Sequence, residues 1–346
     1  MSPYPRRVTE TFDDAREIIA DLHRIVTPSG VHESYQLKAG GVDHCVYARG
    51  NDRGNPVIFF IHGGPASPLA PAAWQFQRPV EEYFTVVTYD QRAAGRTLRT
   101  VDPDTIADTL KIEQYVADAI ELAEQVKDRY GVAKLILVGH SWGTIIATQA
   151  ALIRPDLFLA YVGIGQIINA RTNERLCFDY ALEQARRHDH TEALEELASI
   201  APYPGDEPLT RERIIIARKW AQYRGGLSAY RDDSPYFFGA PLLSPEYTVE
   251  EGETIGEGNQ FTLGRVLDEM LEVDYTGVTE FPIPVLMFLG RHDYTTPAEP
   301  SAAWIEAVQA PYKQAIWFEH SAHLAPWEEP GKFLVSLLNH VRPLVS

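Results

Sequence analysis

Two kinds of hydrophobic pattern alternate along most of the chain. In one, apolar residues occupy consecutive positions, as a strand buried on both faces requires; it covers residues 56–61, 84–89, 134–138, 159–164, 284–289 and 313–318. In the other, apolar residues recur every three or four positions, which is typical of an amphipathic helix; it covers residues 12–26, 111–130, 142–153 and 331–341. This alternation predicts an α/β fold whose parallel sheet is covered on both faces.

Two further segments precede this alternation. Residues 33–38 and 42–48 have extended character and are joined by Ala39-Gly40-Gly41, which predicts a hairpin. We expect this hairpin and the N-terminal helix to belong to the same unit as the parallel sheet.

The alternation is interrupted between residues 169 and 280. The first part of this segment has charged, helical patterns at 179–187, 191–200 and 211–223, and residues 224–260 are rich in Pro, Gly and Tyr. We therefore predict two parts. The α/β core comprises residues 1–168 and 281–346, and residues 169–280 form an inserted, mainly helical cap or lid.

Composition and charge exclude several classes of function. The 346 residues include 31 Lys and Arg against 48 Asp and Glu, a formal net charge of −17. A chain this acidic repels phosphate backbones and anionic lipids, so we expect neither nucleic acid nor a membrane as partner. Its apolar runs are too short to span a bilayer, and we expect a soluble, cytoplasmic protein. The two cysteines, Cys45 and Cys177, indicate neither a disulfide framework nor a zinc site.

The segment Gly139-His140-Ser141-Trp142-Gly143 lies between a predicted buried strand and a predicted helix. In the spacing G-x-S-x-G, the glycines remove side chains where a Cβ would collide, and the serine hydroxyl is presented above the edge of the sheet. The following helix directs its positive end towards negative charge that develops there. We therefore predict that Ser141 is a nucleophile.

A serine hydroxyl needs a base to remove its proton, and the base needs an acid that orients it. Both are expected at the carboxyl ends of later strands, and the last two predicted strands lead to Asp293 and His323. We predict Asp293 as the acid, because its distant rival Asp274 precedes the strand. We predict His323 as the base over His320, which lies nearer the strand.

Acyl transfer also requires two backbone N–H groups directed at the oxyanion. One is expected directly after the nucleophile, at Trp142. The other is expected in the loop 62–66, His-Gly-Gly-Pro-Ala, which follows the first buried strand. We predict Gly64 as this second donor, with Gly63 as its rival, because glycine allows the backbone to approach a substrate closely.

Several motifs in order resemble the prolyl iminopeptidase-like branch of the α/β-hydrolases. They are the loops at 62–66, 90–96, 139–143 and 290–293 and the His323 segment. The resemblance covers about residues 30–168 and 281–340. It implies an eight-stranded, mostly parallel sheet, a helical cap, a Ser-His-Asp triad, and no metal or cofactor. Ala66 and Ala93 stand where the family usually has glycine.

The segment Asp90-Gln91-Arg92 follows the strand 84–89. Arg92 or Asp90 could contact the substrate. We favour instead an internal network of ion pairs and hydrogen bonds that holds the oxyanion loop.

The predicted cap departs from the family. Prolyl iminopeptidases present cap glutamates to the substrate's α-ammonium, one of them in a W-x-x-W-E pattern, whereas this chain has Trp220-Ala-Gln-Tyr223-Arg224. Glu257 is a loose match to a second acid. Two like charges about 4 Å apart repel by about 4 kcal/mol at an effective dielectric constant near 20, so Arg224 in the pocket would disfavour an ammonium. Trp220 and Tyr223 are further candidates for substrate contact.

These observations predict a serine hydrolase that cleaves a small amide or ester through an acyl-enzyme. The resemblance favours a proline iminopeptidase, an N-terminal aminopeptidase acting on a short peptide. Arg224 favours the alternative, an esterase or amidase for a non-peptide small molecule. A non-catalytic, ligand-binding hydrolase fold is the third hypothesis.

Overall fold

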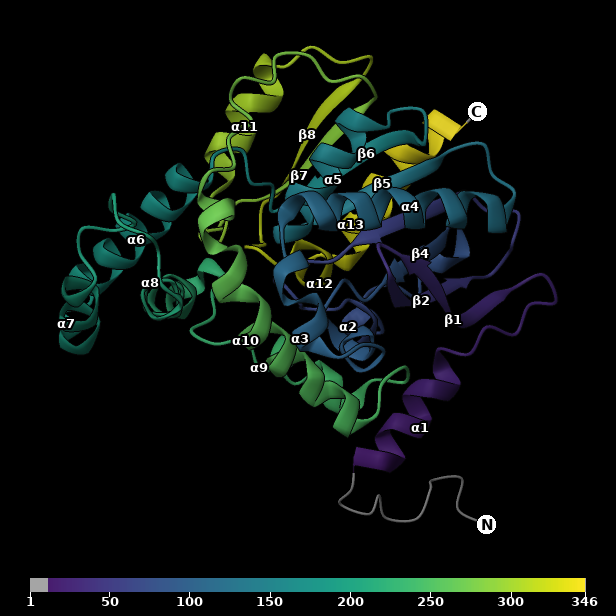
Figure 1. Ribbon diagram of the computed structural model, residues 1–346, viewed down its shortest axis with the longest axis horizontal. Helices are drawn as coiled ribbons and strands as arrows, with labels where there is room; N and C mark the ends of the chain where they lie inside the picture. Colours follow the sequence, from purple (N-terminus) through teal and green to yellow (C-terminus); the bar gives the residue numbers. More distant parts are fainter. Residues whose placement is uncertain (1–11, 346) are drawn as a thin grey trace.

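The computed structural model describes residues 12–345, in which eight strands form one sheet (Figure 1). The strands are β1 (Val31–Ala39), β2 (Val42–Gly50), β3 (Val57–Ile61), β4 (Thr85–Tyr89), β5 (Leu135–His140), β6 (Phe158–Ile164), β7 (Val285–Gly290) and β8 (Lys313–Phe318). Their order in the sheet is β1-β2-β4-β3-β5-β6-β7-β8. The predicted hairpin is present as β1 and β2, each longer than its extended pattern.

The sheet is mostly parallel, as predicted. The pairs β1–β2 and β2–β4 are antiparallel, and every pair from β4–β3 to β7–β8 is parallel. All residues of β3, β4, β5 and β7 are buried, which explains why these strands are apolar on consecutive positions. The carboxyl ends of the parallel strands therefore lie along one edge of the sheet.

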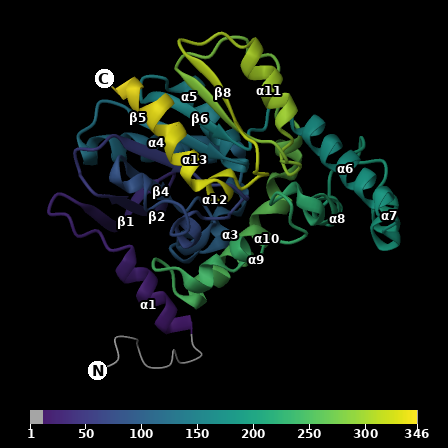
Figure 2. The ribbon, with the colours of Figure 1, turned by 180° about the vertical axis from the view of Figure 1, so that it is seen from behind.

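Helices cover both faces of this sheet (Figures 1 and 2). One face packs against α4 (Ile112–Tyr130), α5 (Trp142–Ile153) and α11 (Ala298–Ala307). The opposite face packs against α2 (Ala70–Ala73), α12 (Ala325–Glu328) and α13 (Pro330–Ser336). The short helix α3 (Pro103–Ile106) precedes α4.

The N-terminal helix is shorter than its hydrophobic pattern. It is α1 (Phe12–Leu22), it has no buried residue, and it projects away from the sheet (Figures 1 and 2). Among residues 12–345, no helix combines the length and the apolar character that crossing a bilayer demands.

Five helices lie between β6 and β7, and we refer to residues 169–280 as the inserted segment. The helices are α6 (Ala170–Arg187), α7 (Thr191–Ser199), α8 (Arg211–Ala221), α9 (Pro235–Phe238) and α10 (Val249–Leu271). Helices α7 and α8 match the predicted patterns within two residues, whereas α6 begins nine residues before its predicted pattern at 179. Figures 1 and 2 show α6, α7 and α8 at one side of the sheet and α10 near its carboxyl edge.

The 23-residue helix α10 is the largest element that the composition of the inserted segment did not predict. Its sequence contains several glycines, which lower the helical propensity of an isolated chain. A capping box starts the helix, because Thr248 accepts from the Glu251 N–H while the Glu251 carboxylate accepts from the Thr248 N–H. Buried side chains such as Val266 and Leu267 then hold it against the rest of the molecule.

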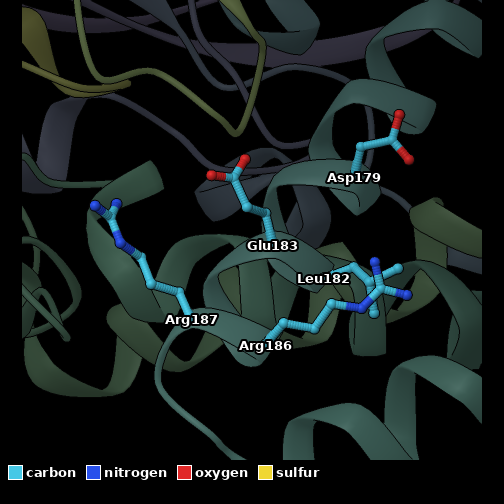
Figure 3. A pocket seen from close by; sticks show the side chains of 5 residues that line it. All are labelled: Asp179, Leu182, Glu183, Arg186 and Arg187. Atoms are coloured by element: carbon cyan, nitrogen blue, oxygen red, sulfur yellow. The ribbon is translucent and has the colours of Figure 1, made fainter.

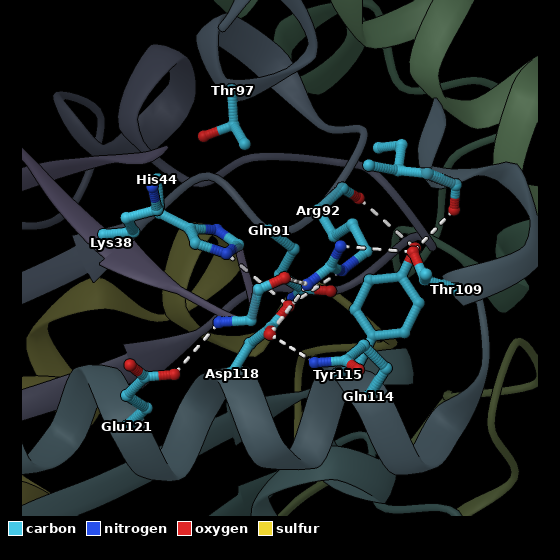
Figure 4. A network of polar contacts seen from close by, with 12 residues as sticks. Lys38, His44, Gln91, Arg92, Thr97, Thr109, Gln114, Tyr115, Asp118 and Glu121 are labelled. Carbon is cyan, nitrogen blue, oxygen red and sulfur yellow. Dashed lines mark hydrogen bonds and ion pairs between the residues drawn. The ribbon is translucent and has the colours of Figure 1, made fainter. Parts of the chain in front are cut away.

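A buried ion pair anchors the loop after β4 (Figure 4). Arg92 is 1% exposed and donates to both carboxylate oxygens of Asp118 on α4, over 3.0 and 2.9 Å. It also donates to the carbonyl of Gly40 in the β1–β2 turn and to the hydroxyl of Thr109. Arg92 therefore connects its own loop to α4, to the β1–β2 turn and to the segment of Thr109. These partners agree with the predicted role of Arg92 in an internal network of ion pairs and hydrogen bonds.

Replacing Asp118 tests this anchor. We expect Asp118→Ala to lower the free energy of unfolding by about 3 kcal/mol, because it leaves the buried Arg92 guanidinium without its counter-charge. Urea denaturation followed by circular dichroism measures the change. The matched control is Asp128→Ala, which removes an exposed partner of Lys127 and should cost less than about 1 kcal/mol. Equal effects of the two variants would contradict the assigned role of Asp118.

Candidate active site

Ser141 occupies a strained turn between β5 and α5. Its backbone has φ 54° and ψ −125°, a conformation that residues with a side chain seldom adopt. A Cβ at Gly143 would collide with the carbonyl oxygen of Ile61, and a Cβ at Gly139 would lie 2.9 Å from the Ala147 Cβ. Gly139 therefore lets β5 and α5 come close enough to form the turn, and Gly143 lets α5 approach the end of β3.

Asp293 and His323 form a buried hydrogen-bonded pair. Asp293 follows β7, His323 follows β8, and the Nδ1 of His323 lies 2.9 Å from Oδ2 of Asp293. Both residues are buried. Because an ionised carboxylate only accepts, the pair places a proton on Nδ1 and leaves Nε2 of the imidazole as the acceptor.

The carboxylate of Asp293 is held by its own loop. Its Oδ1 accepts from the backbone N–H groups of Thr295 and Thr296 over 2.9 and 2.7 Å, and the Thr296 hydroxyl donates to Oδ2 over 2.9 Å. A Cβ at Gly165 would lie 2.7 Å from Cε1 and 2.9 Å from Nδ1 of the imidazole. These contacts define the position of the carboxylate and leave room for the imidazole.

The predicted rivals lie in other surroundings. His320 is exposed. Asp274 accepts from the backbone N–H and the hydroxyl of Thr276. The described hydrogen bonds of Asp274 thus do not involve His323.

One cavity of about 770 Å³ brings the predicted catalytic groups together. Ser141 and His323 line it, as do Gly63, Gly64 and Trp142, the predicted oxyanion donors. Trp142 is the first residue of α5, so helical hydrogen bonding leaves its N–H without a partner. Gly63 and Gly64, the two predicted candidates for the second oxyanion donor, both line this wall. Gly64 has φ +121°, and a Cβ at Gly63 would lie 3.0 Å from the Cβ of Ser141.

A chain of buried hydrogen bonds holds the oxyanion loop beside the serine turn. The backbone N–H of Gln91 donates to His62 Nε2 over 3.1 Å, and its side-chain amide donates to the His62 carbonyl over 2.7 Å. The Gln91 side-chain oxygen accepts from the Trp142 indole over 3.0 Å. Burial lowers the pKa of His62 to about 4, so its imidazole is neutral and accepts.

His140 is a residue of the site to which the sequence analysis gave no role, although it occupies the first x position of the G-x-S-x-G motif. Its Nε2 lies 3.1 Å from the His323 carbonyl, and the two rings are 4.8 Å apart. Burial and the neighbouring His323 lower the pKa of His140 to about 3. His140 is therefore a neutral support for the backbone of the histidine loop.

The cavity wall is largely apolar. In the described part of the chain, two of its lining residues carry a formal charge at neutral pH, Arg218 on α8 and Glu253 on α10. The Arg218 guanidinium donates hydrogen bonds to the Glu174 carboxylate and to the carbonyl of Thr295. The Glu253 carboxylate has no hydrogen bond or ion pair with any residue between 12 and 345. Glu253 is therefore the free charge of the wall.

The predicted substrate contacts in the inserted segment lie outside this cavity wall. Arg224 is 3.3 Å from Asp232, because α8 ends in a π-turn (Gln222–Gly226) that diverts the chain. Glu257 is 2.5 Å from the guanidinium of Arg99, at the surface.

Trp220 and Tyr223 pack edge to face and line a separate recess of about 540 Å³. Trp220 also donates to Glu196 over 2.7 Å. The sequence pattern therefore located helix α8 but neither helix α10 nor the charged residues of the cavity wall, Arg218 and Glu253.

Another hollow lies on the surface of α6 (Figure 3). All of its lining side chains come from this one helix: Asp179, Leu182, Glu183, Arg186 and Arg187. None of the predicted catalytic residues is among them, so the cavity at Ser141 remains the candidate active site.

The inserted segment is bonded to the loops of both Asp293 and His323. The carbonyl of Gly226 accepts from the Thr295 N–H over 3.0 Å, and the carbonyl of Leu227 accepts from the His323 N–H over 3.1 Å. Glu328 adds a bridge, since its carboxylate accepts from the N–H groups of Ala229 and Ala322 over 2.6 and 2.8 Å. Burial raises the pKa of Glu328, which shows that the protein holds this carboxyl in a poorly solvated place.

Residues 56–330 match the family described as the alpha/beta hydrolase fold, and the chain belongs to this family. The chain is 29% identical to a probable aminopeptidase, YbaC, of Bacillus subtilis, over 89% of this chain and 95% of the relative. It is 34% identical to a proline iminopeptidase of Neisseria meningitidis serogroup B, over 74% of this chain and 78% of the relative.

A comparison of structures agrees with this assignment at the level of the fold. The proline iminopeptidase-related protein from Thermus thermophilus superposes with a TM-score of 0.62 at 20% identity, over 91% of this chain and 99% of the other. The protein is thus a prolyl iminopeptidase-like α/β-hydrolase, which confirms the resemblance found in the sequence motifs.

The bridge made by Glu328 generates a prediction about local stability. We expect Glu328→Gln to speed hydrogen exchange of the Ala229 and Ala322 amides and to lower the free energy of unfolding by about 1–3 kcal/mol. The reason is that the amide group of Gln can accept from only one of the two N–H groups through its single oxygen. Exchange mass spectrometry with urea denaturation measures both effects.

The matched control for Glu328 is Glu319→Gln, which changes an exposed glutamate paired with Arg291. This control should leave exchange at both amides unaltered. Unchanged exchange in Glu328→Gln would show that the bridge contributes nothing.

Proposed function

We propose that the protein is a serine hydrolase that cleaves a small amide or ester through an acyl-enzyme, with Ser141, His323 and Asp293 as its triad. One observation carries the proposal. The strained Ser141 turn shares a cavity wall with His323, whose imidazole is already bonded to a buried carboxylate. The proposal also includes the role of residues 169–280 as a cap, because α8, α9 and α10 contribute side chains to that wall.

The reaction follows from the roles of these groups. Nε2 of His323 accepts the proton of the Ser141 hydroxyl as the oxygen attacks the substrate carbonyl, and Asp293 stabilises the imidazolium that forms. The N–H groups of Trp142 and Gly64 bind the oxyanion. His323 then protonates the leaving group, and a water molecule, deprotonated by His323, releases the acyl group from Ser141.

For the substrate we propose an amine-bearing amide, as in an N-terminal aminopeptidase. Two observations support this choice, the aminopeptidase names of the relatives and the free carboxylate of Glu253 in the cavity wall. A carboxylate without a partner favours an ammonium group nearby. The argument from Arg224 for a non-peptide substrate loses its basis, since this residue pairs with Asp232 outside the cavity wall.

An esterase or amidase for a neutral small molecule is the second candidate. It is favoured by the apolar character of the remaining wall, which includes Ile167, Ile214, Leu227, Phe237, Leu263 and Trp327. Such a surface gains free energy by removing apolar groups from water, whatever charge the substrate has elsewhere.

Replacing Ser141 and His323 tests the triad. We expect Ser141→Ala and His323→Ala each to reduce kcat/KM by about 10³-fold or more, because triad members act as a unit. Hydrolysis of p-nitrophenyl acetate and of proline and alanine anilides provides the measurement. The matched control is His320→Ala, an exposed histidine three residues away, which should retain activity.

Labelling by a fluorophosphonate probe separates catalysis from mere binding. The unchanged protein should be labelled at Ser141, as located by mass spectrometry. Absence of labelling would favour the non-catalytic, ligand-binding alternative. Substantial hydrolysis by Ser141→Ala would place the nucleophile elsewhere.

A substrate panel with a Glu253 variant separates the two candidate functions. We expect Glu253→Gln to lower the ratio of kcat/KM for free-amine anilides to that for N-blocked anilides by up to about 5-fold, because Glu253 is exposed and an exposed ion pair contributes up to about 1 kcal/mol. Glu257→Gln is the matched control one turn along α10, and it should leave this ratio unaltered. An unchanged protein that prefers blocked or neutral substrates would favour the esterase or amidase.

A further inference from the structure

Helix α10 contains four glycines, Gly252, Gly256, Gly258 and Gly264, at interior positions. Glycine destabilises a helix relative to alanine, because its backbone loses more conformational freedom on folding. Each of these glycines therefore calls for a physical reason, and the surroundings of the four differ.

Gly258 is explained by close packing. A Cβ at this position would collide with the carbonyl oxygen of Ala93 and lie 3.3 Å from the Cβ of Ala66. The adjacent residue Asn259 donates to the Pro65 carbonyl over 2.9 Å. Gly258 thus allows α10 to contact the loop after β4 and the oxyanion loop.

Gly256 has no such explanation. A Cβ built there meets no atom within 4 Å, and at Gly252 it meets only the Cβ of Pro241, at 3.4 Å. Both glycines line the cavity that contains Ser141. The spacing of three and four residues from Gly252 to Gly256, Asn259 and Leu263, which all line the cavity, places them on one face of the helix. Gly252 is half-buried and Gly256 is exposed, so the space left by the missing side chains lies where the cavity opens to solvent.

We propose that Gly252 and Gly256 determine substrate specificity by leaving room in the cavity for a bulky apolar group of the substrate. This inference rests on the proposed function, since it assumes that acyl transfer takes place at Ser141. The substrate class is then an amide or ester that carries a large apolar acyl or leaving group. Nearby apolar side chains of the same wall, Leu242 and Val249, offer this group further contact.

Gly264 provides a control within the same helix. A Cβ at Gly264 also meets no atom within 4 Å, and this residue, which is exposed like Gly256, does not line the cavity. Leucine has a high helical propensity, so Gly256→Leu and Gly264→Leu should stabilise α10 to a similar extent. We expect each to raise Tm by about 1–3 °C. Both variants therefore change the helical propensity of α10 in the same way, but only Gly256→Leu adds a side chain at a position that lines the cavity.

The experiment measures how fast Ser141 reacts with two fluorophosphonates, one with a methyl group and one with a decyl chain. We expect Gly256→Leu to lower the ratio of the decyl rate to the methyl rate by about 10-fold or more, since a filled apolar pocket rejects larger groups to about this degree. Gly264→Leu should keep the ratio of the unchanged protein. Mass spectrometry confirms that Ser141 carries the label.

Three outcomes would overturn the inference. They are an unaltered ratio in Gly256→Leu, an equal fall in both leucine variants, and an equal loss of both rates in Gly256→Leu, which would indicate general damage to the site. If any one of these outcomes occurs while Ser141 of the unchanged protein is labelled, the proposed function stands and the proposed role of Gly252 and Gly256 in specificity fails. Absence of labelling in the unchanged protein would contradict both.

Discussion

The candidate active site depends on the parallel pairing of β5, β6, β7 and β8. This pairing brings the turns after β5, β7 and β8 to one edge of the sheet, although Ser141, Asp293 and His323 are far apart in sequence. A backbone hydrogen bond of 2.9 Å from the Ser141 N–H to the Ile164 carbonyl continues the pairing into the serine turn. The strained backbone of Ser141 persists because strand β5 on one side and residues 142–148 of α5 on the other are buried.

Buried polar groups then position the loops around this turn. His62, Gln91 and Trp142 form a continuous set of hydrogen bonds, and the ion pair of Arg92 with Asp118 anchors the loop from which Gln91 comes. Each group is satisfied by a partner within the protein, and a partner lost in such surroundings costs more than a hydrogen bond at the surface.

The inserted segment contributes side chains to the cavity wall at Ser141 and is bonded to the loops around it. Gly226, the last residue of the π-turn, accepts from the Thr295 N–H, and Leu227 accepts from the His323 N–H. Helix α10 packs through Gly258 against the loops that contain Ala66 and Ala93. The same segment supplies Glu253 and the glycine face of α10, so it is also where the substrate is selected under the proposed function.

The sequence alone predicted the parallel sheet and the order of its strands along the chain, and it singled out Ser141, Asp293 and His323 as the candidate triad. Apolar runs on consecutive positions, and polar motifs directly after them, are local signals that depend on burial within each strand. Which residues of the inserted segment line the cavity with Ser141 was decided only by the tertiary structure. The capping box of α10 is a local signal, but side chains such as Val266 and Leu267 hold this glycine-rich helix by packing against distant parts of the chain, and the π-turn after α8 directs Arg224 towards Asp232. No local pattern encodes that packing, because it depends on which distant residues surround the helix.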